Sequence, residues 1–407
     1  APTISVIIAA YNEATVIAKT IASVQRSTFA GTREIPAGEA PAAPTISVII
    51  AAYNEATVIA KTIASVQRST FAPLEILVVD DGSTDDTAAV VANIAGVRLL
   101  RQPNGGKASA LNHAIHHAQG EVLVALDADT VLDARAIEKL VAHFADPRVG
   151  AVAGNVKVGN RGKLATMLQS IEYITSQNLD RRAWARLNAI TVVPGAIGAW
   201  RRDAVEQAGG YAIDTMAEDM DLTWTLREAG WVIANENDAI SYTEAPESVR
   251  ALFRQRFRWA FGTLQCLWKH RRAFGRYGWF GAAMIPSLWL FQIALPLLSP
   301  VVDLQILRTL AEMLLELATR GAIDANLSHS LALFGAMFAL FTVTDTAASL
   351  IAFRIEGERL APLPLLVLQR FFYRQVMYAA IFKSVLTAIQ GLRTGWNKLE
   401  RLGTVEV

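Results

Sequence analysis

Runs of apolar, β-branched residues alternate with segments of helical periodicity along the first part of the chain. The pattern predicts four strand–helix pairs, with strands over residues 45–53, 75–80, 97–100 and 121–127 and helices over residues 55–68, 84–95, 107–118 and 133–144. This alternation is typical of right-handed βαβ units around a parallel sheet. The strands are nearly continuous apolar runs, which indicates a sheet covered on both faces. Ligands of such sheets bind beyond the carboxyl ends of the strands, so we expect functional residues just after each strand.

Two long apolar segments dominate the last third of the chain. Residues 277–302 contain no Asp, Glu, Lys or Arg, and neither do residues 325–344, whose apolar pattern continues past Asp345 to Phe353. Both exceed the roughly 18 apolar residues that indicate a membrane-spanning helix. Residues 304–320, between the two segments, are predicted to form an amphipathic helix. We therefore expect a folded domain followed by membrane helices.

A third apolar segment, residues 362–390, is expected either to span the membrane or to lie in its interface, because it carries Arg370, Arg374 and Lys383. Basic residues also gather before the first span. By the positive-inside rule they predict that the domain ahead of the spans is cytoplasmic. Two spans would keep the basic tail on that side, whereas three would place it on the other; the sequence leaves both open.

The chain begins with an exact repeat, because residues 1–30 and residues 43–72 are identical. Natural repeats diverge, so a perfect double copy indicates a very recent duplication or an artefact of assembly. Only the second copy runs on into the next predicted strand, and we assign the first strand to it, although the first copy fits equally well. The expected organisation is a duplicated segment and linker (1–42), a catalytic domain (43–275), a membrane region (276–392) and a tail (393–407).

Composition narrows the classes of function. The 407 residues are 52% apolar and 18% charged, and the low charged fraction fits a protein that is partly soluble and partly in the membrane. The net charge of +1 gives no electrostatic reason to bind nucleic acid, so no nucleic-acid partner is expected. The single cysteine, Cys266, excludes an internal disulfide and a cysteine-rich metal site.

Acidic residues follow two of the predicted strands. Asp127 and Asp129 flank one small residue after the fourth strand, where both carboxylates can face one cation. Mg²⁺ and Mn²⁺ prefer such oxygen ligands and commonly share them with substrate phosphates. The alternative is a turn whose aspartate caps the next helix. Asp80 and Asp81 follow the second strand and either accept hydrogen bonds from a base or ribose or belong to a sharp turn.

Two further segments combine turn residues with charge. Residues 104–107 (NGGK) open the third predicted helix, where the glycines let the backbone approach a ligand and the helix N-terminus favours an anion. The alternative is a flexible loop with a solvated Lys107. Glu218, Asp219 and Asp221 suit the first turn of a helix, and one of them can also serve as a general base toward a hydroxyl nucleophile.

A basic segment that is predicted to be helical lies just before the membrane and contains residues 255–259 (QRFRW). Arg258 can hold a diphosphate. Trp259 offers a flat face against which a sugar ring can stack. The alternative is a juxtamembrane helix with snorkelling arginines and an interfacial tryptophan.

In their order and spacing, the motifs AAYNEA, VVDDGS, NGGK, DAD, AED and Q-x-x-R-W resemble those of family 2 glycosyltransferases of the GT-A fold, specifically the processive membrane synthases of β-linked polysaccharides. The resemblance covers residues 43–402. The third acidic motif reads Ala217-Glu218-Asp219, where many relatives have Thr-Glu-Asp, and the acid pair is retained. The family implies an α/β GT-A catalytic domain, Rossmann-like with a mostly parallel sheet, followed by C-terminal transmembrane helices.

The resemblance also implies a role for each motif. The residues implied at the nucleotide are Asn54, Glu55, Asp80, Asp81, Lys107 and Asp127, and those implied at Mg²⁺ or Mn²⁺ are Asp127 and Asp129. Asp219, with its neighbour Glu218, is implied as the catalytic base. The residues implied at the diphosphate and the acceptor end of the glycan are Gln255, Arg258 and Trp259, with residues 195–200 (GAIGAW) lining the acceptor site.

The implied reaction is a single displacement that transfers sugar from a UDP-sugar donor to a growing glycan and inverts the anomeric carbon. The whole-chain pattern is most similar to synthases of N-acetylglucosamine polymers, which makes UDP-N-acetylglucosamine the expected donor, with UDP-glucose as the second candidate. Two rival functions are transfer of one sugar to a lipid, and an inert nucleotide-sensing scaffold. The expected location is a bacterial inner membrane, in contact with lipid, with a cytoplasmic catalytic domain; an accessory membrane protein is left open. A Rossmann dehydrogenase is excluded, because the first strand runs into AAYNEA without G-x-G-x-x-G.

Overall fold

An eight-stranded mixed sheet organises the N-terminal half of the computed structural model, which describes residues 43–391 and 403–404. The first copy of the repeat lies outside the described residues, and β1 comes from the second copy. The strand order is β3-β2-β1-β4-β7-β6-β8-β5. The strands are β1 (Ile46–Ala52), β2 (Glu75–Asp80), β3 (Arg98–Arg101), β4 (Val122–Asp127), β5 (Val131–Leu132), β6 (Val149–Val158), β7 (Gly198–Arg201) and β8 (Val232–Thr243).

The first four strands in space form the parallel part that the sequence predicts. β1 pairs in parallel with β2 and β4, and β2 with β3. In this register Ala52 lies opposite Asp80 and Ala51 opposite Asp127. The acidic ends of β2 and β4 therefore meet at one edge of the sheet. Beyond β4 the sheet becomes mixed, since β7 runs antiparallel to β4 and β6, and β5 antiparallel to β8.

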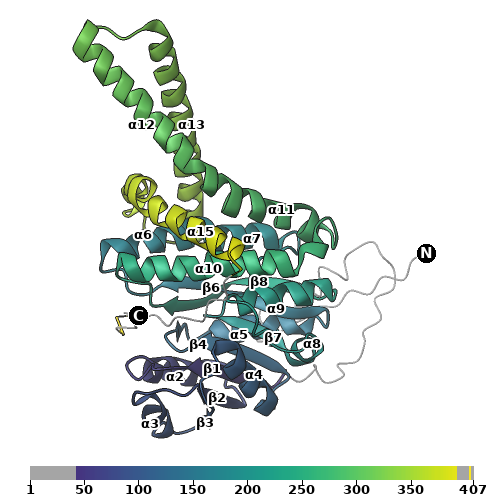
Figure 1. The fold of residues 1–407 in the computed structure, drawn as a ribbon. Helices are drawn as coiled ribbons and strands as arrows, with labels where there is room; N and C mark the ends of the chain where they lie inside the picture. Colours follow the sequence, from purple (N-terminus) through teal and green to yellow (C-terminus); the bar gives the residue numbers. More distant parts are fainter. Residues whose placement is uncertain (1–42, 392–402, 405–407) are drawn as a thin grey trace, which may run out of the picture. The chain divides into compact units, whose positions relative to one another are not determined.

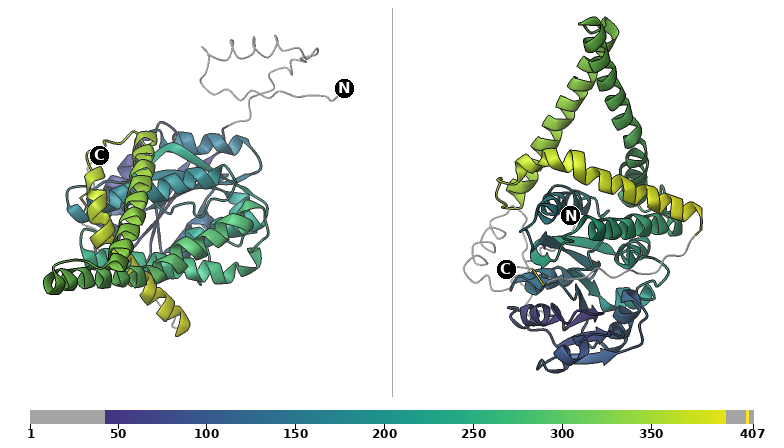
Figure 2. Two further views of the ribbon diagram at one scale, coloured as in Figure 1. Left: turned by 90° about the horizontal axis from the view of Figure 1, so that it is seen from above. Right: turned by 60° about the vertical axis from the view of Figure 1, so that its left-hand side comes forward.

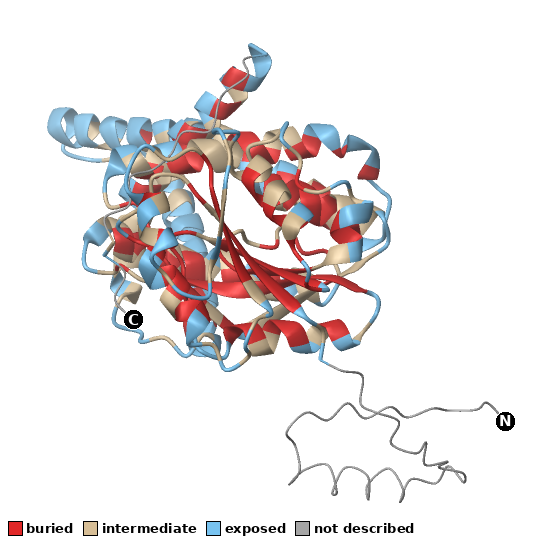
Figure 3. Ribbon diagram, turned by 90° about the horizontal axis from the view of Figure 1, so that it is seen from below, coloured by how far each residue is buried: buried red, intermediate tan, exposed pale blue. Residues whose placement is uncertain are grey.

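Helices cover both faces of the sheet. Successive side chains of a strand point to opposite faces, so each strand contributes to two cores. One buried core contains Val48 and Ile50, and the other contains Ile49. The first core packs against α2 (Ile59–Gln67), α3 (Thr87–Ala92) and α5 (Ala136–Ala142), and the second against α4 (Lys107–His117), α8 (Arg202–Gln207) and α9 (Glu218–Glu228). Figure 3 shows the buried strands between these helices.

A helical layer separates the sheet from the C-terminal helices (Figure 1). It consists of α6 (Leu164–Glu172), the π-helical turn η2 (Tyr173–Asn178), α7 (Leu179–Ala185) and α10 (Val249–Lys269). The hydroxyl of Ser248 caps α10 by accepting a hydrogen bond from the amide of Ala251 at 3.2 Å. A buried cluster joins this layer to the C-terminal region, with Ile171, Leu252, Phe353 and Tyr373 in contact.

Two helices of the described region are long and apolar enough to cross a membrane: Phe280–Arg320 and Ala325–Ile355. The second is α13, and the first is built from η4 (Phe280–Met284), α11 (Ile285–Ser287), η5 (Leu288–Ala294) and α12 (Leu295–Arg320). α12 and α13 form a hairpin that projects from the sheet domain (Figure 2). The helix predicted over residues 304–320 is present as the second part of α12, which continues unbroken from the first apolar segment. Its Arg308 and Glu312 pair with each other at 2.8 Å.

The third apolar segment lies against the helical layer. It is built from η6 (Leu363–Leu365), α14 (Leu366–Leu368), η7 (Gln369–Tyr373) and α15 (Arg374–Ile389), and α15 packs against α10 and α12. Arg374 donates to the hydroxyl of Ser299 at 3.3 Å, and Gln375 donates to Asp303 at 3.1 Å. These contacts join the third apolar segment to α12.

Buried ion pairs fix the turn after α13 to the sheet domain. Glu356, whose side chain is 2% exposed, accepts from Arg182 of α7 at 2.5 Å. Glu358 pairs with Lys157 of β6 at 2.9 Å and with Arg161 at 2.8 Å. Burial would raise the pKa of Glu358, but hydrogen bonds from Arg161 and Lys157 outweigh it and hold that pKa at about 2. These ion pairs attach the C-terminal end of α13 to the sheet domain, from which the hairpin also starts.

Candidate active site

Most residues that the sequence singles out line one cavity of about 570 Å³ at the carboxyl edge of the sheet. It runs from the ends of β1 and β4, past α9 and α10, to residues of η5 and α15. The predicted residues that line it are Glu55, Asp81, Lys107, Asp127, Asp129, Glu218, Asp219, Gln255, Arg258 and Trp259. Asn54 and Asp80 are not among its lining residues. The topology thus gathers motifs that are more than 200 residues apart in the sequence.

A lysine bridges two acidic motifs inside the cavity. The Lys107 ammonium lies 2.5 Å from Oδ1 of Asp127 and 3.1 Å from Oε1 of Glu218. Burial would lower the pKa of Lys107, but Asp127, Glu218 and Asp219 outweigh it and raise it. The lysine is therefore a fixed positive charge, held between the end of β4 and the start of α9.

Asp219 is half-buried and lies next to another carboxylate, that of Glu218. Burial first, and then the neighbouring carboxylate of Glu218, raise the pKa of Asp219 to about 6, against the opposing effect of Lys107. Its Oδ2 accepts a hydrogen bond from the amide of Gly195 at 3.1 Å. A Cβ at Gly195 would collide with the Lys107 ammonium, so only glycine allows this close approach. A carboxyl group with a pKa near 6 in a cavity is suited to general-base chemistry.

Asp127 and Asp129 provide the oxygen donors that a divalent cation needs. Both line the cavity, and Asp129 is buried with a long hydrogen bond of 3.4 Å from the hydroxyl of Thr243. In the described part of the chain, no group of three or more His, Cys, Asp or Glu side chains is placed to hold a metal. Two carboxylates fit a hard cation that takes its remaining ligands from water and substrate phosphates, so the donor set fits Mg²⁺ or Mn²⁺.

The NGGK loop is occupied by a protein carboxylate. Asp81 accepts hydrogen bonds from the amides of Gly105 and Gly106 at 2.9 and 2.8 Å, and from Gln102 at 2.7 Å. The expectation that these amides approach a ligand is therefore wrong for this structure, because Asp81 satisfies them. Asp81 remains at the cavity wall, where it connects the end of β2 to the start of α4.

Asn54 and Asp80 shape the loops beside the cavity. Asn54 adopts a positive φ of 54°, and its side-chain oxygen accepts from the amide of Thr84 at 2.7 Å. Asp80 accepts from the amide of Ser83 at 3.1 Å. The next helix, α3, begins only at Thr87 and has no side-chain cap. Asn54 and Asp80 thus hold the turn after β2 against the end of β1.

α10 presents Gln255, Arg258 and Trp259 to the cavity, three and four residues apart and hence on one helical face. Residues 195–200 are divided: Gly195 and Ala196 line the cavity, whereas Ile197 and Trp200 are buried in the core beneath it. The expectation that the whole GAIGAW segment lines the site is wrong, because β7 begins at Gly198 and turns its side chains into the core.

Several lining residues carry no sequence signal strong enough to identify them. Glu172 and Tyr173 come from the helical layer, and Arg256 comes from inside the predicted QRFRW motif. The only signal for Arg256 is its place within that motif. Glu172 and Tyr173 lie at the end of an amphipathic helical segment. The sequence does not show which element this segment packs against, so it could not show that these two residues line the cavity.

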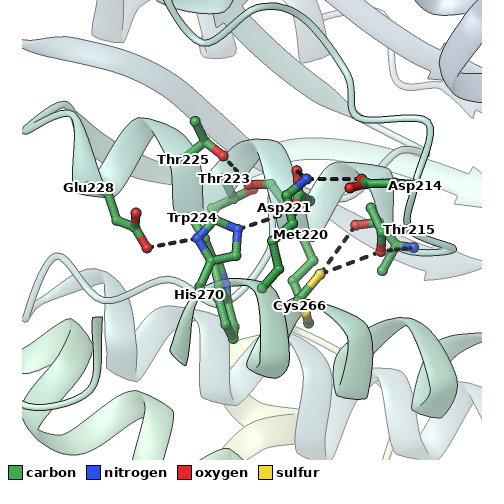
Figure 4. A network of polar contacts seen from close by, with 12 residues as sticks. Asp214, Thr215, Met220, Asp221, Thr223, Trp224, Thr225, Glu228, Cys266 and His270 are labelled. Atoms are coloured by element: carbon green, nitrogen blue, oxygen red, sulfur yellow. Dashed lines mark hydrogen bonds and ion pairs between the residues drawn. The ribbon is translucent and has the colours of Figure 1, made fainter. Parts of the chain in front are cut away.

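Polar contacts join α9, which carries Asp219, to α10, which carries Trp259 (Figure 4). His270 contacts Asp221 at 3.0 Å and Glu228 at 2.7 Å. Burial would lower the pKa of His270, but these two carboxylates outweigh it and raise it to about 9. The protonated imidazole therefore clamps the end of α10 onto α9.

A solved structure resembles nearly the whole described chain. The mannosyltransferase PcManGT from Pyrobaculum calidifontis, in complex with GDP-Man and Mn²⁺, matches with a TM-score of 0.62 and 23% identity, over 86% of this chain and 88% of its own. This likeness shows the GT-A fold that the sequence predicts, with a mostly parallel sheet followed by C-terminal helices.

Known sequences resemble about half of this chain. The poly-beta-1,6-N-acetyl-D-glucosamine synthases of Staphylococcus aureus (strain COL) and Staphylococcus epidermidis are 33% and 32% identical over 193 residues. These alignments cover 46% of this chain and 47% of each relative, so the chain spans about half the length of the curated relatives it matches. Residues 47–209 match the family model described as Glycosyl transferase family 2. The chain therefore carries a domain that matches glycosyl transferase family 2.

Proposed function

We propose that the chain is an inverting, processive glycosyltransferase that extends a β-linked glycan from UDP-N-acetylglucosamine at a membrane. One observation carries the proposal: a single cavity brings a half-buried carboxyl group of raised pKa, Asp219, together with the Lys107–Asp127 pair and Trp259. A transferase needs a base, a charged end for the donor and a flat surface for the acceptor sugar, and these residues supply all three.

The donor nucleotide binds at the β1–β2–β4 edge in this proposal. Glu55 and Asp81 line the cavity there and accept hydrogen bonds from base and ribose, while Asn54 and Asp80 hold the loops. Lys107 neutralises phosphate charge from the start of α4. Asp127 and Asp129 would hold Mg²⁺ or Mn²⁺, which supplies stabilisation of the negative charge that develops on the departing diphosphate.

Asp219 acts as the base. Its carboxylate accepts the proton of the acceptor hydroxyl while that oxygen attacks the anomeric carbon from the face opposite the leaving diphosphate, so an α-linked donor gives a β-linked product. The Gly195 amide, 3.1 Å from Oδ2, orients the carboxylate. Glu218 contributes by raising the pKa of Asp219 and by fixing Lys107.

The acceptor end of the glycan lies on α10. Trp259 stacks against the sugar ring, and Gln255 and Arg258 donate to sugar or phosphate oxygens from the same helical face. The cavity continues to Phe291 of η5 and Ile381 of α15. A product that leaves past these residues moves toward the candidate spans, which fits synthesis at a membrane.

We further propose that two helices span the membrane and that the sheet domain is cytoplasmic. The latch at Glu356 and Glu358 holds the end of α13 beside the sheet domain, and α15 packs along α10. Gly403 and Thr404 also reach the sheet domain, where both amides donate to Glu244 at 2.8 and 3.3 Å. The hairpin therefore leaves and returns on one side, and the basic residues around Arg271 support a cytoplasmic position for that side.

The similarity to poly-beta-1,6-N-acetyl-D-glucosamine synthases supports the choice of donor. The test supplies the membrane-embedded chain with Mg²⁺ or Mn²⁺ and, separately, UDP-N-acetylglucosamine, UDP-glucose or GDP-mannose, and measures nucleotide release with product size. We expect UDP release and a long product with UDP-N-acetylglucosamine alone. A product with one added sugar would contradict processivity, and turnover of UDP-glucose instead would contradict the assigned donor.

A further inference from the structure

Arg256 is a buried arginine at the acceptor end of the cavity. It lies within the QRFRW segment, between the residues to which the resemblance gives roles. It is 4% exposed and lines the cavity. Burial would lower the pKa of Arg256, but Glu172 and the phenol of Tyr373 outweigh it and raise it, so the guanidinium is charged.

Arg256 is held from two sides by elements that are distant in the sequence. Its Nη2 donates to Oε2 of Glu172 at 2.5 Å and to the hydroxyl of Tyr373 at 2.8 Å. The same hydroxyl donates to Oε2 of Glu172. Glu172 ends α6, Arg256 lies in α10, and Tyr373 ends η7 of the third apolar segment. The three side chains form a closed triangle that joins the membrane-side segment to the sheet domain.

The guanidinium also covers one face of Trp259. Its central carbon lies 4.2 Å from the centroid of the indole, one helical turn further along α10. Tyr173, the residue after Glu172, lies on η2 with its ring centroid 6.4 Å from that of Trp259. A cation–π contact of this kind is worth roughly 0.5–2 kcal/mol and fixes the plane of the ring. The indole is therefore held by contacts that begin at Glu172 and Tyr373.

A purely stabilising role explains this arrangement poorly. The Nε and Nη1 atoms of Arg256 are buried and make no hydrogen bond within the part of the chain that the structure describes. Unused donors on a buried charged group are costly, and a methionine or leucine would fill the same space at no such cost. Buried donors without a partner call for an explanation other than stability, and a role at the functional site is one.

We propose that Glu172, Arg256 and Tyr373 form a positioning triad that sets the plane of Trp259 for the acceptor sugar. The triad makes acceptor binding depend on the seating of η7 against the helical layer, and so connects the membrane interface to the active site. This inference rests on the proposed acceptor role of Trp259. Glu172 and Tyr373 act through Arg256 and do not touch the reacting atoms.

The test compares Tyr373→Phe with a matched control, Tyr378→Phe. Both hydroxyls belong to buried tyrosines of the same C-terminal segment, but that of Tyr378 makes no hydrogen bond among the described residues. Calorimetry on the full chain in detergent measures binding of a β-1,6-linked N-acetylglucosamine pentasaccharide and, separately, of UDP. We expect Tyr373→Phe to weaken pentasaccharide binding about tenfold, because the hydroxyl loses its hydrogen bonds to two charged groups, Arg256 and Glu172, while UDP binding and the control remain unchanged.

A second variant, Arg256→Lys, keeps the positive charge but loses the planar guanidinium. We expect about tenfold weaker pentasaccharide binding and a raised KM for this acceptor, with little change in kcat. Full pentasaccharide affinity of Arg256→Lys would overturn the inference, since it would show that a positive charge alone is enough for acceptor binding. Equal losses of pentasaccharide affinity in Tyr373→Phe and Tyr378→Phe would also overturn it.

The two proposals fail in different ways. Unmodified protein that binds the pentasaccharide but transfers no sugar from any donor would count against the proposed transferase and leave the triad standing, because its test is a binding test. Unmodified protein that releases UDP and makes polymer, yet binds acceptor equally well after Tyr373→Phe, would overturn the triad alone. Absence of any pentasaccharide binding by the unmodified protein would overturn the triad.

Discussion

At the scale of single residues, the site depends on close approaches that only small side chains allow. Gly195 lies where the β-carbon of any other residue would meet the Lys107 ammonium, with Asp127 and Asp219 also within 3.5 Å of that position. Three charged groups from β4, α4 and α9 therefore converge on one glycine. A single methyl group added at Gly195 would therefore change the distances between these charged groups.

We predict that Gly195→Ala displaces Lys107 and lowers the rate of sugar transfer about 100-fold, since a misplacement of about 1 Å costs this much in an organised site. The control is Gly162→Ala, because nothing lies within 4 Å of a β-carbon at Gly162. Initial rates of UDP release measure both variants. Equal rates for Gly195→Ala and Gly162→Ala would show that the Lys107 cluster does not organise the reaction.

The sequence predicted the residues of the site better than their contacts. Asp127, Asp219 and Trp259 follow from motif and position, because strand ends and helix faces converge predictably. The contact between Asp81 and the NGGK amides did not follow, since a backbone amide can serve a ligand or a protein carboxylate equally well. Arg256 belongs to a motif that the sequence singles out, yet its partners lie 84 and 117 residues away.

At the scale of elements, the α9–α10 contact holds the proposed base and the proposed acceptor platform together. His270 faces Asp221 and Glu228 of α9, and the neighbouring Lys269 also pairs with Asp221 at 3.1 Å. The pKa of His270 is raised from 6.5 to about 9. A raised pKa stabilises the fold most below the unfolded value, and this contribution disappears as the pH rises through the folded value.

We therefore predict that His270→Gln destabilises the protein at pH 6 and has little effect above pH 9. The loss at pH 6 is expected to be about 1–3 kcal/mol, as for a hydrogen-bonded charged group. Thermal unfolding in detergent at the two pH values measures the difference. A variant as destabilised at pH 9.5 as at pH 6 would show that protonation of His270 is not what holds α10 to α9.

The latch, which consists of the ion pairs of Glu356 and Glu358, joins the turn after α13 to the sheet domain. The side chain of Glu356 is 2% exposed and pairs with Arg182 at 2.5 Å, so its removal leaves a guanidinium without its partner. We predict that Glu356→Ala destabilises the fold by about 3 kcal/mol. Glu206→Ala is the control, because its pair with Arg202 is exposed and is worth less than about 1 kcal/mol.

Chemical or thermal unfolding of the two variants side by side measures the difference. A Glu356→Ala variant as stable as Glu206→Ala would mean that the hairpin is oriented by apolar packing alone. The sequence predicted the helices that the latch connects but not the latch, since acidic residues after a span are equally consistent with a solvated loop.

At the scale of the whole molecule, the C-terminal helices return to the sheet domain. The hairpin turn near Ala322 lies between the two candidate spans, while Ala361 lies beyond the latch. The sequence predicted both apolar segments from their length and composition. It left the third segment open, because an apolar helix with three basic residues can lie in a membrane or against a protein, and its contacts with α10 and α12 join residues that are far apart in the sequence.

We predict that a cysteine introduced as Ala322→Cys reacts with an impermeant maleimide from outside intact cells, whereas Ala361→Cys reacts only after permeabilisation. Both positions are exposed in the structure, and the native Cys266 is buried. Labelling of Ala361→Cys in intact cells would contradict a hairpin that returns to the cytoplasmic side.

The central claim is that the cavity around Asp219 transfers sugar to a growing glycan. The most direct measurement compares the unmodified chain with Asp219→Asn in membranes, recording polymer made from UDP-N-acetylglucosamine and, in parallel, UDP binding. Asp203→Asn, an exposed aspartate of α8, is the control. We expect polymer from the unmodified chain and the control, and none from Asp219→Asn despite unchanged UDP binding. Polymer of the same length and yield from Asp219→Asn would contradict the account.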